Sequence, residues 1–468
     1  MEEKWKVSKV DKSRVKIKEN MTKKEIRSMV VDLAWPSIAE MTLMSLVGIA
    51  DMIMVGRLGP DIGPRAISAV GLSNQPLFFA MAIFRAFNVG TTALVARFMG
   101  AEEQESANET AKQNLVLVII SSIVIGLLGV LFAERIIIFM GAETDVISMG
   151  TIYLRISSIG MIFNMISMGL SAVLRGAGDT RTPMRINMTS NVINVTANYI
   201  LIYGKLGFPA LGVAGAALAT SFSRVVSSMW ILITVLRGKS IIKISFRDGY
   251  QLNKEIVRRI LQIGFPASME QFIVRSGMLF FARIVAGLGT ITFAAHQIAL
   301  NVMSLSFMPG MGLSVAASTL VGMGLGAKKP HIAERSGFEA QKLGIITTSI
   351  LGLAFILFAP WIVLLYNNNP EVVVKGVLVL RIVGLIQPAQ ATQFILAGGL
   401  RGAGDTKWPL YTSALGIWGV RIILAMYFIN QMDLGLAGAW LALSLDQIIR
   451  SILIYYRFKS GQWKDSQV

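Results

Sequence analysis

Four carboxylic acids lie inside long apolar stretches of this sequence, where an ionised side chain finds little water. They are Glu40, Asp51, Glu270 and Asp446. A charge in the middle of a lipid bilayer costs at least about 2.5–3.5 kcal/mol on insertion scales, so an acid placed there usually has a function. A buried carboxyl group can take up a proton or hold a metal cation. Both are reversible binding steps of the kind that ion-coupled transport requires.

Other residue types exclude several alternative chemistries. The chain has no cysteine, and its two histidines are His296 and His331. Disulfides and thiolate metal sites are therefore excluded, and zinc chemistry based on histidine has little scope. No nucleophile motif, metal-ligand cluster or cofactor fingerprint is present, so we expect neither an enzyme nor a resident cofactor.

The composition indicates a membrane protein. Of 468 residues, 54% are hydrophobic and only 15% are charged, whereas a soluble domain carries about 25% charged residues. The mean hydropathy is +0.61. The net charge of +17 lies between the apolar blocks, so it does not indicate nucleic-acid binding.

The apolar blocks are long enough to cross a bilayer. The stretches 114–133 and 344–366 contain no charged residue, and both exceed the roughly 18 residues that a spanning helix needs. The fold class we predict is an all-α polytopic membrane protein with twelve transmembrane helices in two six-helix pseudo-symmetric lobes. The predicted spans are 30–56, 66–97, 113–133, 146–174, 184–203, 211–236, 259–288, 291–325, 343–367, 372–400, 408–429 and 435–456.

Basic residues give the orientation of these spans. Ten lysines and arginines precede residue 30, and seven more lie in the connection 237–259, whereas the loops of opposite parity hold five. The positive-inside rule then places both termini in the cytoplasm of a multi-pass protein of the cell (inner or plasma) membrane. The partner expected for the basic loops is anionic lipid.

The second half of the chain repeats the first. Leu174-Arg-Gly-Ala-Gly-Asp-Thr180 recurs as Leu400-Arg-Gly-Ala-Gly-Asp-Thr406, and Trp35-Pro36 with Glu40 recurs as Phe265-Pro266 with Glu270. Each half holds six spans, so both halves enter the membrane with the same polarity, and a transport pathway between them is expected. The predicted division is a basic segment 1–29, an N-lobe 30–237, a linker 238–258, a C-lobe 259–458 and a tail 459–468.

The repeated segment is predicted to be a structural turn at a cytoplasmic helix end. Its glycines can adopt positive φ, and pairing of Arg175 with Asp179, and of Arg401 with Asp405, would close a tight turn on which helix groups pivot. The segment lacks the Gly-Lys-Ser/Thr ending of a phosphate-binding loop, and no strand precedes it.

Four motifs together resemble the multidrug and toxic compound extrusion (MATE) family. The first is Asp51-Met-Ile-Met-Val-Gly-Arg-Leu-Gly59, and the second is the duplicated turn. The others are Asn194-Val-Thr-Ala-Asn-Tyr-Ile-Leu-Ile-Tyr-Gly204 and Gly212-Val-Ala-Gly-Ala-Ala-Leu-Ala-Thr220. The resemblance covers nearly the whole chain. It implies two lobes arranged as a V around a central cleft, and export of small organic, mostly cationic compounds driven by entry of Na⁺ or H⁺.

The resemblance also implies a cation site in the N-lobe. It assigns Asp51 to a site for Na⁺ or H⁺ together with Asn194, Asn198 and Thr220. One branch of the family has a second aspartate where this chain has Asn198, so a proton-sharing carboxylate pair is lost here. The repeat aligns Asp51 with Phe281, which confines the acid to one half and favours a function over symmetric packing.

The remaining titratable groups have two interpretations each. Glu270 and its repeat mate Glu40 are candidates for binding a proton or the substrate; the alternative for Glu270 is pairing with Arg275 or Arg283 on its own helix. Asp446 is expected to form a structural pair with Arg450. His296 could relay protons, but a hydrogen-bonded buried histidine is expected.

Three other functions fit the sequence less well than an antiporter. A lipid or lipid-linked oligosaccharide flippase of the same superfamily would need many basic residues in its cleft, and few lie within the spans here. A membrane enzyme lacks any catalytic motif, and a channel lacks a filter-like repeated loop. We therefore expect a secondary antiporter that works by alternating access and is monomeric.

Overall fold

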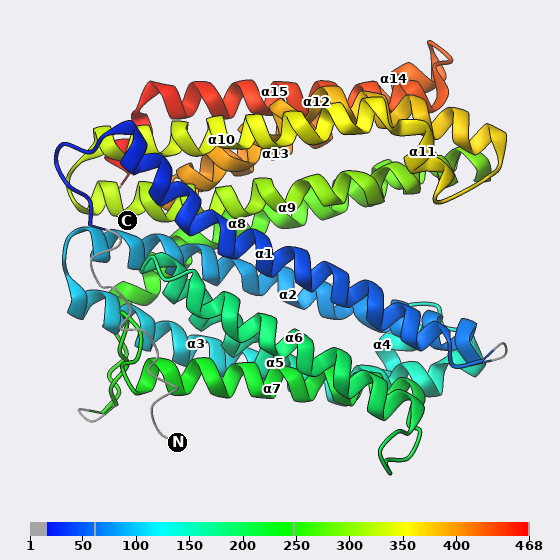
Figure 1. Ribbon diagram of the computed structural model, residues 1–468, viewed down its shortest axis with the longest axis horizontal. Coiled ribbons are helices and arrows are strands. Elements are labelled where there is room, and N and C mark those ends of the chain that lie inside the picture. Colours follow the sequence, from blue (N-terminus) through cyan, green and yellow to red (C-terminus); the bar gives the residue numbers. More distant parts are fainter. Residues whose placement is uncertain (1–15, 60–61, 247–248, 467–468) are drawn as a thin grey trace. The chain divides into compact units, whose positions relative to one another are not determined.

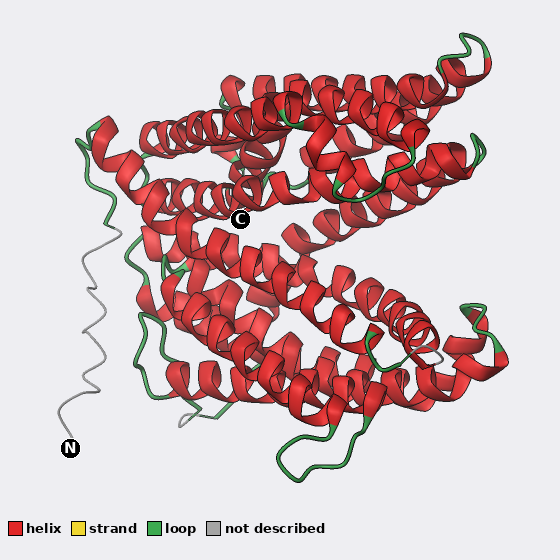
Figure 2. Cartoon of the chain, turned by 45° about the vertical axis from the view of Figure 1, so that its right-hand side comes forward, coloured by secondary structure: helices red, strands yellow, loops and turns green. Residues whose placement is uncertain are grey.

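The computed structural model describes residues 16–59, 62–246 and 249–466, and these residues form helices without any strand (Figures 1 and 2). The helices are α1 (Lys23–Gly56), α2 (Ile62–Gly100), α3 (Gln104–Leu131), α4 (Ala133–Phe139), α5 (Thr144–Gly176), α6 (Arg181–Tyr203), α7 (Gly212–Leu236), α8 (Lys254–Ala286), α9 (Thr290–Gly326), α10 (Pro330–Leu357), α11 (Ala359–Leu364), α12 (Pro370–Gly402), α13 (Lys407–Ala414), a π-helix (Leu415–Ile422), α14 (Ile423–Asn430), α15 (Gly435–Ser460) and a 3-10 helix (Gln462–Asp465).

Each of the twelve predicted spans corresponds to a long helix, and the predicted fold class is confirmed. Nine helical segments within the described residues are long and apolar enough to cross a membrane. Two spans differ in detail from the prediction. The span 343–367 breaks where α10 ends at Leu357 and the short α11 begins, and the span 408–429 contains the π-helix between α13 and α14.

Local sequence explains where several helices begin and end. A capping box opens α1: Thr22 Oγ1 accepts a hydrogen bond from the Glu25 amide at 3.2 Å, and Glu25 Oε2 accepts one from the Thr22 amide at 2.8 Å. Asn369 caps α12 by accepting from the Glu371 amide at 2.9 Å. Side chains thus satisfy amides that the first turn of a helix leaves without partners.

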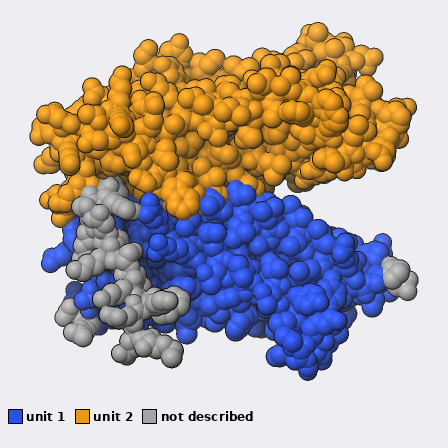
Figure 3. All heavy atoms as spheres, in the orientation of Figure 1, with its two compact units in different colours: residues 1–14, 39–95, 103–261 blue, residues 15–38, 96–102, 262–468 orange. Residues whose placement is uncertain are grey.

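The described chain divides into two compact units, coloured in Figure 3. Unit 1 contains 39–95 and 103–261, and unit 2 contains 15–38, 96–102 and 262–468. The units are not contiguous in sequence, because three helices are shared, and the last part of α2 belongs to unit 2 from Ala96 onward. The first part of α1 belongs to unit 2 up to Ile38, and the first part of α8 belongs to unit 1 up to Leu261.

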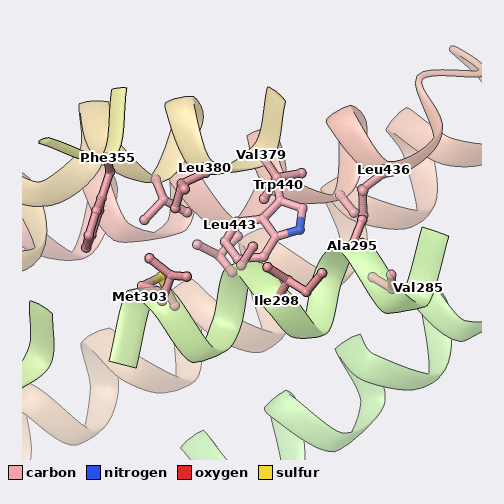
Figure 4. Packing of buried hydrophobic residues seen from close by; sticks show 14 of the residues in the cluster. Val285, Ala295, Ile298, Met303, Phe355, Val379, Leu380, Leu436, Trp440 and Leu443 are labelled. Carbon is pink, nitrogen blue, oxygen red and sulfur yellow. The ribbon is translucent and has the colours of Figure 1, made fainter. Parts of the chain in front are cut away.

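Each unit has its own apolar core. In unit 1, Leu154, Met161 and Met165 of α5 pack with residues of α2, α3 and α4. In unit 2, Trp440 and Leu443 of α15 pack between α9 and α12 (Figure 4). Trp440 is completely buried. Burial of this apolar surface, rather than helix propensity, holds such helices together in one unit.

The repeated turns have the same geometry in both units. Gly178 and Gly404 have φ of +84° and +90°, a left-handed conformation that favours glycine. A Cβ atom on Gly176 would lie 2.7 Å from the Thr92 carbonyl oxygen, and one on Gly402 would lie 2.0 Å from that of Ser318. The motif therefore needs glycine twice in each copy, once for the turn and once for a close helix contact.

The residues after α15 are packed against unit 2. Trp463, in the predicted tail 459–468, is completely buried and stacks on Phe458 with ring centroids 4.8 Å apart. Its indole nitrogen donates to the Phe458 carbonyl at 2.6 Å. Lys464 pairs with Glu334 at 2.5 Å, and Arg97 donates to the Ser466 carbonyl at 2.8 Å.

We expect Trp463→Phe to lower the free energy of unfolding by about 1–2 kcal/mol, because the Phe458 carbonyl loses its buried donor. Thermal unfolding of the purified protein in detergent measures the change. Trp361→Phe is the matched control, since Trp361 is 64% exposed. Equal effects of the two substitutions would show that the packed segment contributes nothing.

Candidate cation site

The structure brings the four residues of the predicted N-lobe site together inside unit 1. Asn198 Nδ2 donates to Asp51 Oδ1 at 2.5 Å and lies 3.4 Å from Asn194 Oδ1, and Asn194 Nδ2 donates to Thr220 Oγ1 at 3.1 Å. These contacts connect α1, α6 and α7 in one polar chain. An ionised carboxylate only accepts hydrogen bonds, so it fixes the orientation of the Asn198 amide.

The sequence of α6 explains why both amides face the same neighbours. Asn194 and Asn198 are four residues apart and therefore lie on one face of the helix. They are 4% and 0% exposed. The Asn198 Oδ1 atom is buried and has no hydrogen-bond partner among the described residues.

This set of atoms has the chemistry of a site for a hard monovalent cation. It offers a carboxylate, two amide oxygens and a hydroxyl oxygen, and hard cations prefer oxygen ligands. Binding Na⁺ would require the Asn198 amide to turn its oxygen toward the ion. A proton would need only the Asp51 carboxyl group.

One charged residue near this site was not singled out by the sequence. Arg224 follows Thr220 by one turn of α7 and interacts electrostatically with Asp51 and Tyr153. Within the described residues Arg224 forms no ion pair with Asp51, and Asn198 donates the hydrogen bond that Asp51 accepts. Because like charges repel, the Arg224 guanidinium would oppose the entry of a second cation beside Asp51.

We expect Arg224→Gln to raise the apparent affinity for the coupling cation about tenfold, equivalent to ~1.4 kcal/mol. The measurement is the cation concentration that gives half-maximal substrate efflux from proteoliposomes. Arg155→Gln is the control, because Arg155 is exposed on α5. An unchanged or weaker affinity would contradict the repulsion that we assign to Arg224.

Glu40 and Glu270 form equivalent ion pairs with the repeated turns. In unit 1, Glu40 Oε2 lies 3.6 Å from Arg175 Nη1, and Glu40 Oε1 accepts from Asn187 at 2.7 Å. In unit 2, Glu270 accepts from Arg401 at 2.8 and 3.3 Å, and from Ser413 at 3.4 Å.

These pairs correct two expectations from the sequence. Glu270 pairs with Arg401 of α12, and the predicted alternative partners Arg275 and Arg283 both lie exposed on α8. Arg401 therefore does not close its own turn with Asp405, which pairs with Arg457 at 2.8 Å. In the first turn, Asp179 Oδ1 accepts from the Thr182 amide at 3.0 Å. A fixed guanidinium beside each glutamate favours an internal ion pair over binding of a proton or substrate.

Asp446 forms the expected structural pair with Arg450, and a second arginine joins it. Arg450 Nε donates to Asp446 Oδ1 at 2.7 Å, and Arg421 Nη2 donates to Oδ2 at 2.5 Å. The Asp446 side chain is completely buried, and both arginine side chains are 5% exposed. Sequence spacing indicated Arg450 at i+4, but gave no sign of Arg421 on the π-helix.

His296 is buried, as expected, but it is not hydrogen bonded to any described residue. Both ring nitrogens lack a partner there, and the side chain is 1% exposed. Its ring packs against Phe281 and Trp440 at centroid distances of 5.7 and 5.5 Å. His296 is therefore held by ring contacts, and not by the hydrogen bonds that we expected from the sequence.

Known proteins resemble this chain in sequence and in fold. A sequence model of the MatE family matches residues 36–200 and 266–427. A probable multidrug resistance protein NorM of Thermotoga maritima is 34% identical over 454 residues, which cover 95% of this chain and 94% of that protein. The multidrug resistance protein MdtK of Yersinia pseudotuberculosis is 27% identical, with 93% and 95% covered. A crystal structure of a MATE protein in complex with MaD3S has a TM-score of 0.86 at 24% identity, covering 93% and 97% of the two chains.

Proposed function

Since the chain belongs to the MatE family of multi-pass membrane transporters, we propose that it is a secondary active antiporter that exports small organic cations and drugs. In this proposal, entry of Na⁺ or H⁺ drives export by alternating access of the predicted lobes 30–237 and 259–458. Relatives named as multidrug resistance proteins support the class of substrate.

The observation that carries the proposal is the polar chain from Asp51 through Asn198 and Asn194 to Thr220. It joins α1, α6 and α7 within unit 1. A cation bound by these oxygens would favour the arrangement of the three helices that closes around it. A ligand shifts an equilibrium only through its differential affinity for the two states, and shifting a population from 1:99 to 99:1 takes about 5.5 kcal/mol. Binding by several oxygens contributes to such a difference.

The ion-paired arginines of unit 2 argue against the lipid-linked oligosaccharide flippase. A flippase needs basic side chains that are available to a pyrophosphate group. Arg421 and Arg450 are instead committed to Asp446, and Arg401 is committed to Glu270. The antiporter therefore remains the function that fits this chain best.

The experiment that tests the proposal is efflux of ethidium from proteoliposomes under separately imposed gradients. We expect inward Na⁺ or H⁺ movement to drive ethidium out, and the gradient that succeeds identifies the coupling ion. Failure of both gradients to drive efflux of ethidium and of other organic cations would exclude antiport. Transport of a lipid-linked oligosaccharide without any gradient would instead support the flippase.

A further inference from the structure

The helices that form the candidate cation site have counterparts in unit 2. The sequence Gly212-Val-Ala-Gly-Ala-Ala-Leu-Ala at the start of α7 recurs at the start of α15 as Gly435-Leu-Ala-Gly-Ala-Trp-Leu-Ala. The duplicated turns precede α6 in unit 1 and α13 in unit 2. The helix set α1, α6 and α7 therefore corresponds to α8, α13 to α14, and α15.

Contacts inside each unit support this correspondence. Ser190 Oγ donates to the Ser223 carbonyl at 2.7 Å where α6 crosses α7. At the equivalent crossing, Gly416 lies so close to α15 that a Cβ atom on it would be 2.2 Å from Asp446 Oδ1. The two helix pairs cross at the same position of the repeat.

The π-helix then shifts the register by one residue, because its hydrogen bonds span one residue more than those of an α-helix. Asn194 and Asn198 are buried on α6 and lie four residues apart. In unit 2, the buried residues that lie four apart on the equivalent helix, after this one-residue shift, are Arg421 and Ala425. Asn194 thus corresponds to Arg421, and Asn198 to Ala425.

Three of the four site residues are apolar in unit 2. Asp51, Asn198 and Thr220 correspond to Phe281, Ala425 and Leu443, which all belong to the apolar core that contains Trp440 (Figure 4 shows Leu443 and Trp440). The fourth position, which corresponds to Asn194, holds the positively charged side chain of Arg421. The Arg421 guanidinium lies 5.7 Å from the centroid of the Phe281 ring, above the residue that replaces Asp51.

The counter-ion of this built-in cation comes from the neighbouring helix. Asp446 corresponds to Ser223 and accepts four hydrogen bonds from Arg421 and Arg450, at 2.5 to 2.9 Å. Both oxygens of the Asp446 carboxylate are therefore occupied by two arginine side chains, which are part of the chain and cannot leave as a free ion can.

We propose that Arg421 is a tethered cation that permanently occupies unit 2's counterpart of the cation site. Unit 2 then takes no part in the ion cycle, and the Asp446 carboxylate is a latent site for a monovalent cation. The confinement of ion exchange to unit 1 rests on the proposed antiport function, whereas the latent site does not depend on it.

The first test removes the tethered charges in the background D51N, in which the unit 1 site is disabled. We expect ²²Na⁺ equilibrium dialysis of purified D51N/R421Q/R450Q to reveal one Na⁺ bound per chain, and at least a tenfold weaker affinity after D446N is added. D51N alone should bind none. A folded D51N/R421Q/R450Q protein that binds no Na⁺ would overturn the latent site.

The second test keeps the net charge of unit 2 unchanged and covers the case in which the first variant does not fold. R421Q/D446N removes one positive and one negative charge. We expect its cation-driven efflux to stay within about threefold of wild type, with unchanged dependence on cation concentration. A folded R421Q/D446N protein that has lost ion coupling would place the exchangeable cation in unit 2 and overturn the proposal. If wild type shows no coupled efflux, antiport fails, and the dialysis experiment still decides the latent site.

Discussion

Asp51→Asn abolishes ion-driven efflux, with an expected loss of at least about 100-fold in the initial rate. The substitution keeps the shape of the side chain and removes its charge. The Asn198 amide can still donate to the new side-chain oxygen, so the packing of α1 against α6 is preserved. What disappears is the charge that compensates a cation in a medium of low dielectric constant, where such an interaction is worth several kcal/mol.

The initial rate is measured in proteoliposomes under the gradient that drives wild type. Asp433→Asn is the matched control, because Asp433 is exposed between the turn at 431–432 and α15. Wild-type coupling in a folded D51N protein would exclude Asp51 from the ion cycle. Retained substrate binding together with lost coupling is the result that identifies a cation site.

We expect Arg401→Met to cause a large loss of stability in unit 2. It leaves Glu270, whose side chain is 6% exposed, without its guanidinium partner. Breaking a buried ion pair by removing one partner costs about 3–5 kcal/mol, because the remaining charge is uncompensated. The apparent melting temperature and the yield of monodisperse protein should both fall, and the exchange E270R/R401E should restore part of the loss.

An exposed pair on α8 supplies the control. Arg259 and Glu255 form an ion pair with side chains 36% and 70% exposed, and Arg259→Met should cost less than about 1 kcal/mol. Equal effects of Arg401→Met and Arg259→Met would contradict the stabilising role. A stable R401M protein combined with an inactive E270Q protein would instead assign Glu270 to the proton or the substrate.

Hydrophobic patterning was sufficient to predict the long membrane-spanning helices of this protein. Long uncharged runs such as 114–133 leave the backbone no alternative in lipid but a helix. The cluster around Asp51 was also accessible, because Asn194 and Asn198 share a helix face and the motifs matched a family. Their spacing and the resemblance together named all four residues that the structure brings into contact.

The ion pairs of the two repeated turns could not be predicted from the sequence. Glu270 and Arg401 are 131 residues apart, and only the packing of α8 against α12 and α13 decides that they meet. Local spacing pointed instead to arginines on the same helix. The π-helix had no sequence signal that we recognised, so the meeting of Arg421 with Asp446 was also missed.

The sharing of α1, α2 and α8 between the units means that the compact units do not coincide with the two sequence repeats. Unit 2 includes residues up to Ile38 and residues 96–102 from the first repeat, and unit 1 includes the start of α8 from the second. A cut in the connection 238–253 would therefore separate each unit from helical segments that it contains, so neither half of the chain carries a whole unit.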